Sequence, residues 1–145
     1  MDALDRKLID LLRDDGRAPY ADLGERIGLS ASAVKRRVDR MVADGVIRGF
    51  TVMTDPEAVG HSTEAYIELF CRGIVGPNEL TKILEDIPEV IEATTVTGQA
   101  DALVTLRAKD TQDLERALER VRSPGQVDST RSAIVLSRLI ERRAH

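Results

Sequence analysis

The segment GLSASAVKRRVDRMVADGVIRGF, residues 28–50, decides how the first third of the chain folds. Its Gly-Leu pair predicts a turn, and Ser30 is a favourable N-cap for the helix that follows. Gly45 predicts the end of that helix, because glycine adopts the left-handed conformation of a helix C-terminus at little cost. One side of the predicted helix is apolar at helical spacing: Val34, Val38 and Met41.

Two shorter helices are predicted upstream of this segment. Apolar residues at i, i+4, i+7 and i+8 mark the first, with Asp2 as its cap and Gly16 after its end. A second is predicted over Ala21–Ile27. Three short helices with a Gly-containing turn before the last are typical of a helix-turn-helix. The apolar residues of the first helix are Leu4, Leu8, Leu11 and Leu12.

The rest of the chain alternates strand and helix patterns. VIRGFTVMTD, after the helical head, is rich in β-branched residues and predicts a linker strand, and Asp55-Pro56 predicts a turn that Gly60 closes. The order that follows is βαββαβ, the ferredoxin-like arrangement. Its strands are predicted at Ser62–Arg72, Val90–Thr97, Ala102–Ala108 and Val127–Ile140, and its helices around Leu80–Ile87 and Leu114–Val121, the latter capped by Asp110.

The predicted fold class is therefore α+β. A helix-turn-helix head (winged-helix-like) occupies 1–48, a linker strand and turn 49–61, and a ferredoxin-like domain suited to oligomerisation 62–145. The exposed strand edges and apolar faces of such a domain favour a homodimer.

Charge divides the chain in the same way. The formal net charge is -4, yet residues 30–50 carry a net charge of +3. A positive segment on an acidic chain suggests two parts with different partners, the first able to meet a polyanion. No apolar run is long enough to span a membrane and the N-terminus lacks a signal-peptide pattern, so we expect a cytoplasmic protein without a membrane partner.

The basic helix after the Gly-Leu turn predicts a DNA contact. A helix fits the major groove with its N-terminal turns toward base edges, and small residues there allow close approach. A charged stripe is often only a solvated face, and a helical head can also dock a protein, but the helix-turn-helix context favours DNA. Arg37 lies between the two faces and suits an internal salt bridge equally well. The predicted DNA-binding residues are Ser30, Ala31, Ser32, Lys35, Arg36, Arg37 and Arg40.

The stretch from Leu4 to Phe50 resembles the N-terminal region of the Lrp/AsnC (feast/famine) transcriptional regulators. The resemblance continues through Pro88-Glu89-Val90 and Thr97-Gly98 to Pro124-Gly125-Gln126-Val127, so it covers nearly the whole chain. It implies a sequence-specific DNA-binding regulator that forms homodimers and higher even-numbered assemblies on a near-palindromic operator. The shared elements of the head are Leu4-Asp5, Asp14-Asp15-Gly16-Arg17, Leu23, Gly28-Leu29-Ser30, Val34, Arg37-Val38, Gly45-Val46-Ile47 and Gly49-Phe50.

The resemblance also implies a small effector, usually an amino acid, bound near the loop between the second and third strands. Asp101 could meet the ammonium group, and backbone N–H groups around Gly98 and Gln99 the carboxylate. The alternative is a plain turn, for which Gly98 is equally suited. Many members of the family carry a bulkier residue where this chain has Ala100. The predicted effector-binding residues are Thr97, Gly98, Gln99, Ala100 and Asp101.

The sequence argues against an enzyme, because no convergent set of polar residues is visible. His61 falls in a predicted loop and His145 at the C-terminus, without a partner at a recognisable spacing. Cys71 stands alone in an apolar strand, where it is expected to act as a small hydrophobe. We therefore expect no cofactor and no metal.

Overall fold

The computed structural model describes residues 1–140, so His145 and the end of the predicted 62–145 domain lie outside the described residues. The chain divides into two compact units, one built from Met1–Met53 and the other from Thr54–Leu139. Each unit has its own apolar core. No helix among the described residues is long and apolar enough to cross a membrane.

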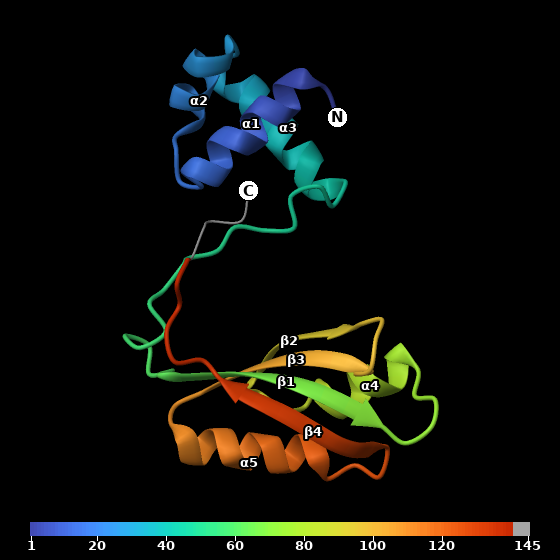
Figure 1. Ribbon diagram of the computed structural model, residues 1–145. Coiled ribbons are helices and arrows are strands. Elements are labelled where there is room, and N and C mark those ends of the chain that lie inside the picture. Colours follow the sequence, from blue (N-terminus) through green and yellow to red (C-terminus); the bar gives the residue numbers. More distant parts are fainter. Residues whose placement is uncertain (141–145) are drawn as a thin grey trace. The chain divides into compact units, whose positions relative to one another are not determined.

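The first unit consists of three helices, α1 (Ala3–Asp14), α2 (Tyr20–Ile27) and α3 (Ala31–Ala43) (Figure 1). Asp2 caps α1 and Ser30 caps α3, as predicted. Gly28 ends α2 with φ +72°, a conformation that glycine adopts without strain. The helices pack around one buried cluster: Leu8, Leu12, Leu23, Val34, Val38 and Met41.

The second unit is the predicted ferredoxin-like domain (Figure 1). Its four strands form one sheet in the order β2-β3-β1-β4, and every neighbouring pair is antiparallel. The elements are β1 (Thr63–Cys71), α4 (Pro77–Leu84), β2 (Val90–Thr95), β3 (Ala102–Ala108), α5 (Thr111–Arg122) and β4 (Val127–Ile134).

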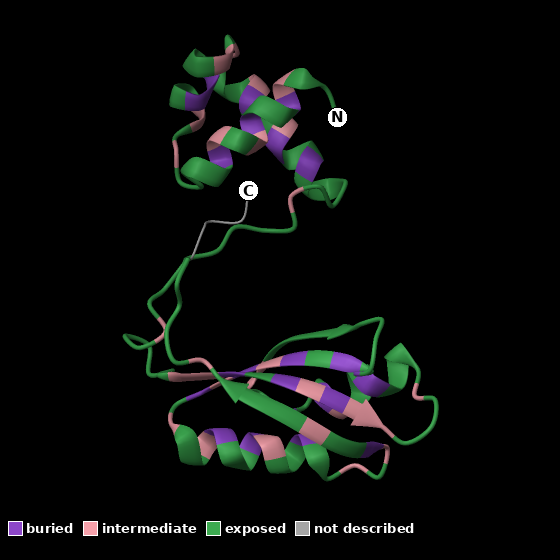
Figure 2. Ribbon diagram, in the orientation of Figure 1, coloured by how far each residue is buried: buried purple, intermediate pink, exposed green. Residues whose placement is uncertain are grey.

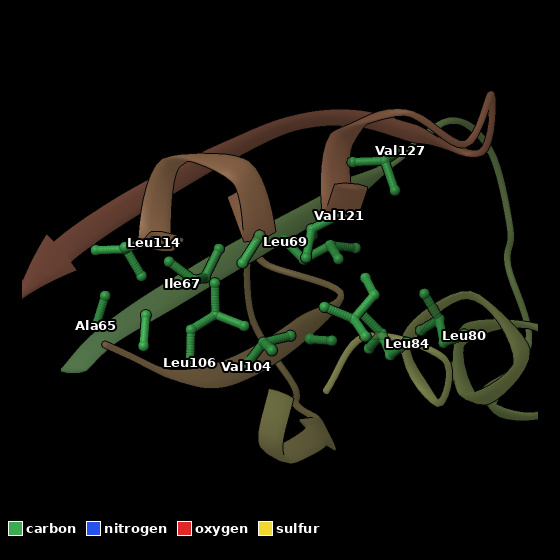
Figure 3. Packing of buried hydrophobic residues seen from close by; sticks show 14 residues of the cluster. Ala65, Ile67, Leu69, Leu80, Leu84, Val104, Leu106, Leu114, Val121 and Val127 are labelled. Atoms are coloured by element: carbon green, nitrogen blue, oxygen red, sulfur yellow. The ribbon is translucent and has the colours of Figure 1, made fainter. Parts of the chain in front are cut away.

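Alternation along the central strands positions the core of this unit. In β1 and β3 every second residue is buried, because one face of the sheet packs on α4 and α5. Figure 3 shows these side chains meeting between the sheet and the two helices. Along these strands, buried residues alternate with exposed and partly exposed ones (Figure 2). The opposite face stays open, and Tyr66 and Leu103 on it are 51% and 44% exposed.

Two predicted strands differ from the structure. The predicted linker strand is not a strand: within the predicted linker (49–61), residues 49–55 follow an extended path outside any sheet and 56–60 form the predicted turn. β-branched residues favour extended backbone, but a strand also needs a partner for its N–H and C=O groups, and residues 49–54 make no backbone hydrogen bond within the described chain.

The last strand is shorter than predicted. β4 ends at Ile134 rather than Ile140, because its partner β1 begins at Thr63. Ile134 pairs with Ala65, and the N–H of Val135 donates the final hydrogen bond to the carbonyl of Glu64 at 2.8 Å. Beyond that point β1 offers no further ladder.

Candidate nucleic-acid interface and effector loop

The N-terminal turn of α3 is fixed by its cap. The hydroxyl of Ser30 accepts a hydrogen bond from the N–H of Ala33 at 3.2 Å, and the Oγ atoms of Ser30 and Ser32 lie 3.1 Å apart. Ser30, Ala31 and Ser32 are all exposed. The end of the helix that carries unpaired N–H groups, and so attracts anions, is therefore open and lined by small side chains.

The outer face of α3 holds two further predicted residues, Lys35 and Arg36. Lys35 Nζ lies 2.6 Å from a carboxylate oxygen of Asp39, one turn along the helix, and both side chains are more than half exposed. This hydrogen bond raises the pKa of Lys35 above its ordinary value. Arg36 is exposed and forms no ion pair with any residue the structure describes.

Arg37 and Arg40 lie on the side of α3 that meets α1. Arg37 Nη1 donates to Asp2 and to Asp5, each at 2.7 Å, and Arg40 Nη2 donates to both carboxylate oxygens of Asp5 at 2.9 and 3.0 Å. Arg37 is 21% exposed and Arg40 53%. Arg37 therefore makes the internal salt bridge that its position between the faces suggested.

The positive patch of α3 is thus smaller than its sequence suggests. Lys35, Arg37 and Arg40 each have a carboxylate partner, and only Arg36 of the four is without one among residues 1–140. An ion pair between exposed groups is weak and exchanges readily, so Lys35 remains available to another anion. Arg37 is held by two carboxylates and is not available to another anion.

Asp5 is the residue that the sequence prediction missed. It is 1% exposed, and its side chain closes a capping box with Asp2 at the start of α1. The Asp-x-x-Asp spacing is a variant of the capping-box pattern and was a visible signal. The link between Asp5 and α3 had no such signal in the sequence, because the bonded residues are separated by more than thirty positions.

The predicted effector loop connects β2 to β3. Gly98 has φ +132°, and the side chains of Thr97 and Gln99 are exposed, whereas Ala100 is only 8% exposed. The loop thus presents two polar side chains and the backbone of Gly98 to solvent, while Ala100 turns inward.

Asp101 already has a structural role. Its Oδ2 accepts a hydrogen bond from the N–H of Cys71 at 2.7 Å, and its own N–H donates to the carbonyl of Leu69 at 2.9 Å. Burial, and then the nearby charge of Asp101, raises the pKa of the Cys71 thiol. One carboxylate oxygen therefore fastens the loop to the end of β1, and the other accepts no hydrogen bond from residues 1–140.

A shallow groove of about 360 Å³ adjoins the loop. The end of β2 and Ala102, which begins β3, form one part of its wall, and residues of α4 form the other. Its lining residues are Pro77, Leu80, Thr81, Leu84, Ala93, Thr94, Thr95 and Ala102.

The remaining candidate reactive side chains of residues 1–140 lie apart from one another in the chain. His61 is exposed at the turn that follows the linker, and Cys71 is half-buried at the end of β1. Among the described residues, no three side chains of His, Cys, Asp or Glu are grouped so as to hold a metal ion.

Two descriptions of known domains match this chain: the AsnC-type helix-turn-helix domain over residues 1–42 and the Lrp/AsnC ligand binding domain over residues 64–145. The chain is 46% identical over 142 residues to the HTH-type transcriptional regulator Rv2324 of Mycobacterium tuberculosis. The alignment covers 98% of this chain and 96% of that relative.

Solved structures show the same fold over nearly all of the chain. The feast or famine regulatory protein (Rv3291c) of M. tuberculosis, complexed with L-methionine, is 36% identical with a TM-score of 0.90, covering 99% of this chain and 97% of that one. The transcriptional regulator NMB0573 of Neisseria meningitidis, also complexed with L-methionine, is 26% identical with a TM-score of 0.87, covering 97% and 93%.

Proposed function

Because the chain belongs to the Lrp/AsnC family of transcriptional regulators, we propose that α3 is its recognition helix and enters the major groove of DNA. The observation that carries this proposal is the two-sidedness of α3. Val34, Val38 and Met41 are at most 2% exposed, whereas the cap and the outer face are open to solvent.

The structure suggests a separate role in DNA binding for each of the seven predicted residues. Ser30, Ala31 and Ser32 bring the helix N-terminus close to a phosphate, which the unpaired N–H groups attract. Arg36, unpaired in the described chain, reaches guanine acceptors on a base edge. Lys35 exchanges Asp39 for a phosphate, Arg40 contacts a phosphate at the rim, and Arg37 holds the helix in place.

A homodimer supplies the second recognition helix. The open face of the sheet, with Tyr66 and Leu103 exposed, supports self-association through the second unit. A two-fold dimer predicts a near-palindromic operator whose half-sites lie about one helical turn apart. Higher even-numbered assemblies follow if dimers associate further.

DNA binding is tested with a duplex that the intact chain selects from a randomised pool. Fluorescence anisotropy at several salt concentrations gives the affinity and its salt slope. Lys35→Ala is expected to reduce the slope by about one, the loss of a single phosphate contact. Arg36→Ala is expected to weaken binding about tenfold or more through a lost base contact.

The matched control is Lys82→Ala, which removes an exposed cation from α4 in the other unit. It should leave affinity and slope unchanged. Wild-type affinity for DNA in both α3 variants would contradict the proposed reading face. Binding that does not weaken as salt rises would instead favour a head that docks a protein.

We further propose that the loop from Thr97 to Asp101 binds an amino acid. The two relatives complexed with L-methionine support this class of ligand. The exposed backbone around Gly98 suits a carboxylate, and the second oxygen of Asp101 suits an ammonium group. The groove beside the loop is lined by apolar and threonine side chains and suits the side chain of such a ligand.

Isothermal titration with L-methionine and the other common amino acids tests this site on the intact chain. Asp101→Asn keeps an acceptor for the Cys71 N–H but removes the charge, so it should weaken binding of the amino acid. Asp86→Asn, at an exposed position just after α4, should not. Unchanged affinity in Asp101→Asn would remove Asp101 from the site. An effector that prefers one dimer arrangement would shift operator affinity by linkage.

A further inference from the structure

A carboxylate lies in the core of the helical head. Asp5 is 1% exposed and is the one charged residue among the buried residues of the described chain. Removing a charged carboxylate from water is costly unless hydrogen bonds and opposite charges compensate. Its partners should therefore reveal why the head retains it.

Four hydrogen bonds satisfy Asp5. The N–H of Asp2 donates to Oδ2 at 2.9 Å, Arg37 Nη1 donates to Oδ1, and Arg40 Nη2 donates to both oxygens. Three of these four bonds come from α3. Asp5 therefore joins the start of α1 to the middle of the proposed recognition helix.

Arg40 is held at one end only. Both of its bonds to Asp5 use Nη2, and its Nε and Nη1 donate no hydrogen bond within the described chain. Its side chain is 53% exposed. Arg40 also continues the exposed stripe of α3, because Ser32, Arg36 and Arg40 follow one another at intervals of four residues. One part of the guanidinium is thus anchored and the other part is open to solvent.

We propose that Asp5 is a positioning residue for DNA binding: it holds Arg40 by Nη2 so that the remaining N–H donors of the guanidinium are ready for a DNA phosphate. This inference rests on the proposed function of α3. A free arginine loses side-chain freedom when it binds, and an arginine held in advance loses less. Such preorganisation corresponds to a gain in affinity of up to about tenfold.

A purely structural role for Asp5 makes a different prediction. In that case Asp5 stabilises the head, and a substitution would weaken DNA binding by the same factor whether or not Arg40 is present. If Asp5 acts through Arg40, the effect of the substitution disappears once Arg40 is gone. A double-mutant cycle in DNA affinity therefore separates the two roles.

The test compares wild type, Asp5→Asn, Arg40→Ala and the double variant of the full chain on the selected duplex, well below each melting temperature. Arg40→Ala should weaken binding and reduce the salt slope by about one. Asp5→Asn should weaken binding about fivefold to tenfold with the slope retained. The double variant should bind like Arg40→Ala alone. Equal effects of Asp5→Asn in both backgrounds would overturn the proposal.

Two further variants keep the test decisive. Asp10→Asn removes an exposed acid from the same helix and should not weaken binding, so loss of negative charge by itself is controlled. Arg40→Lys, at a half-exposed position, does not depend on a change in the core. Its single ammonium group keeps the charge but cannot hold Asp5 and a phosphate through separate nitrogens, so the variant should bind DNA more weakly than wild type.

Wild-type affinity and slope in Arg40→Lys would overturn the proposal even if Asp5→Asn did not fold. The outcome is also distinct from failure of the proposed function. If Arg36→Ala weakens binding while the Asp5 and Arg40 variants do not, α3 still reads DNA and only the role of Asp5 is refuted.

Discussion

Replacing Asp101 should expose its structural role before any ligand is considered. The bond from the Cys71 N–H to Oδ2 is 2.7 Å long and has a charged acceptor, and bonds of that kind contribute about 1.5–3 kcal/mol. Because Asp101 is exposed, we take the lower end, about 1.5 kcal/mol. In a domain of this size, such a loss lowers Tm by about 6–12 °C.

Asp101→Ala removes the acceptor altogether, whereas Asp101→Asn retains a neutral acceptor at the same place. Differential scanning calorimetry of the intact chain without ligand should therefore show the full decrease for Ala and less than half of it for Asn. Asp86→Ala, an exposed acid in the same unit, should leave Tm unchanged. Equal decreases for Asn and Ala, or none for Ala, would refute the hydrogen bond as the link between the loop and β1.

Three other predictions concern the helical head. Asp39→Asn should strengthen DNA binding about threefold at low salt, measured by anisotropy, because it frees Lys35 and removes a negative charge from the DNA-facing side. The hydrogen bond from Arg37, and then that from the Asp5 N–H, lowers the pKa of Asp2 to about 2, so its stabilising effect is present above the ordinary value near 3.8 and is lost as pH falls toward 2. Between pH 5 and pH 2, the Tm obtained from melting curves should accordingly fall less for Asp2→Asn than for wild type. Gly24→Ala should cost about 3 kcal/mol in urea unfolding, since its Cβ would collide with the backbone carbonyl of Leu29.

The order of the elements could be predicted because it depends on local signals. Helical spacing of apolar residues located α1 and α3, and the caps Asp2, Ser30 and Asp110 fixed where three helices begin. Strand-like stretches predicted β1 and β3, whereas the single buried face of the sheet emerged only from the burial along these strands in the structure. Each of these signals lies within a dozen residues of the element that it predicts.

The lengths of the extended segments could not be predicted in the same way. Residues 49–55 and 135–139 have compositions suited to strands, but a strand exists only where another strand meets it. β1 ends the pairing of β4, and nothing in the described chain pairs with the linker. The missing information concerned partners rather than propensity.

The charged face of α3 shows the same limit. The sequence places Lys35, Arg36, Arg37 and Arg40 close together and predicts a strongly positive surface. In the structure Asp39, a neighbour on the helix, and two carboxylates from the start of the chain neutralise most of it. A pairing across more than thirty residues has no local pattern, so only the geometry separates a cation available to DNA from one that holds the head together.

The most direct test of the central claim, that α3 reads DNA, is the selection from a randomised duplex pool by the intact chain. A recognition role for α3 predicts enrichment of a near-palindrome with half-sites about one helical turn apart. It also predicts that Arg36→Ala loses the preference at one position in each half-site while Lys82→Ala keeps it. A pool that remains random after selection by the wild-type chain, or an unchanged motif selected by Arg36→Ala, would contradict it.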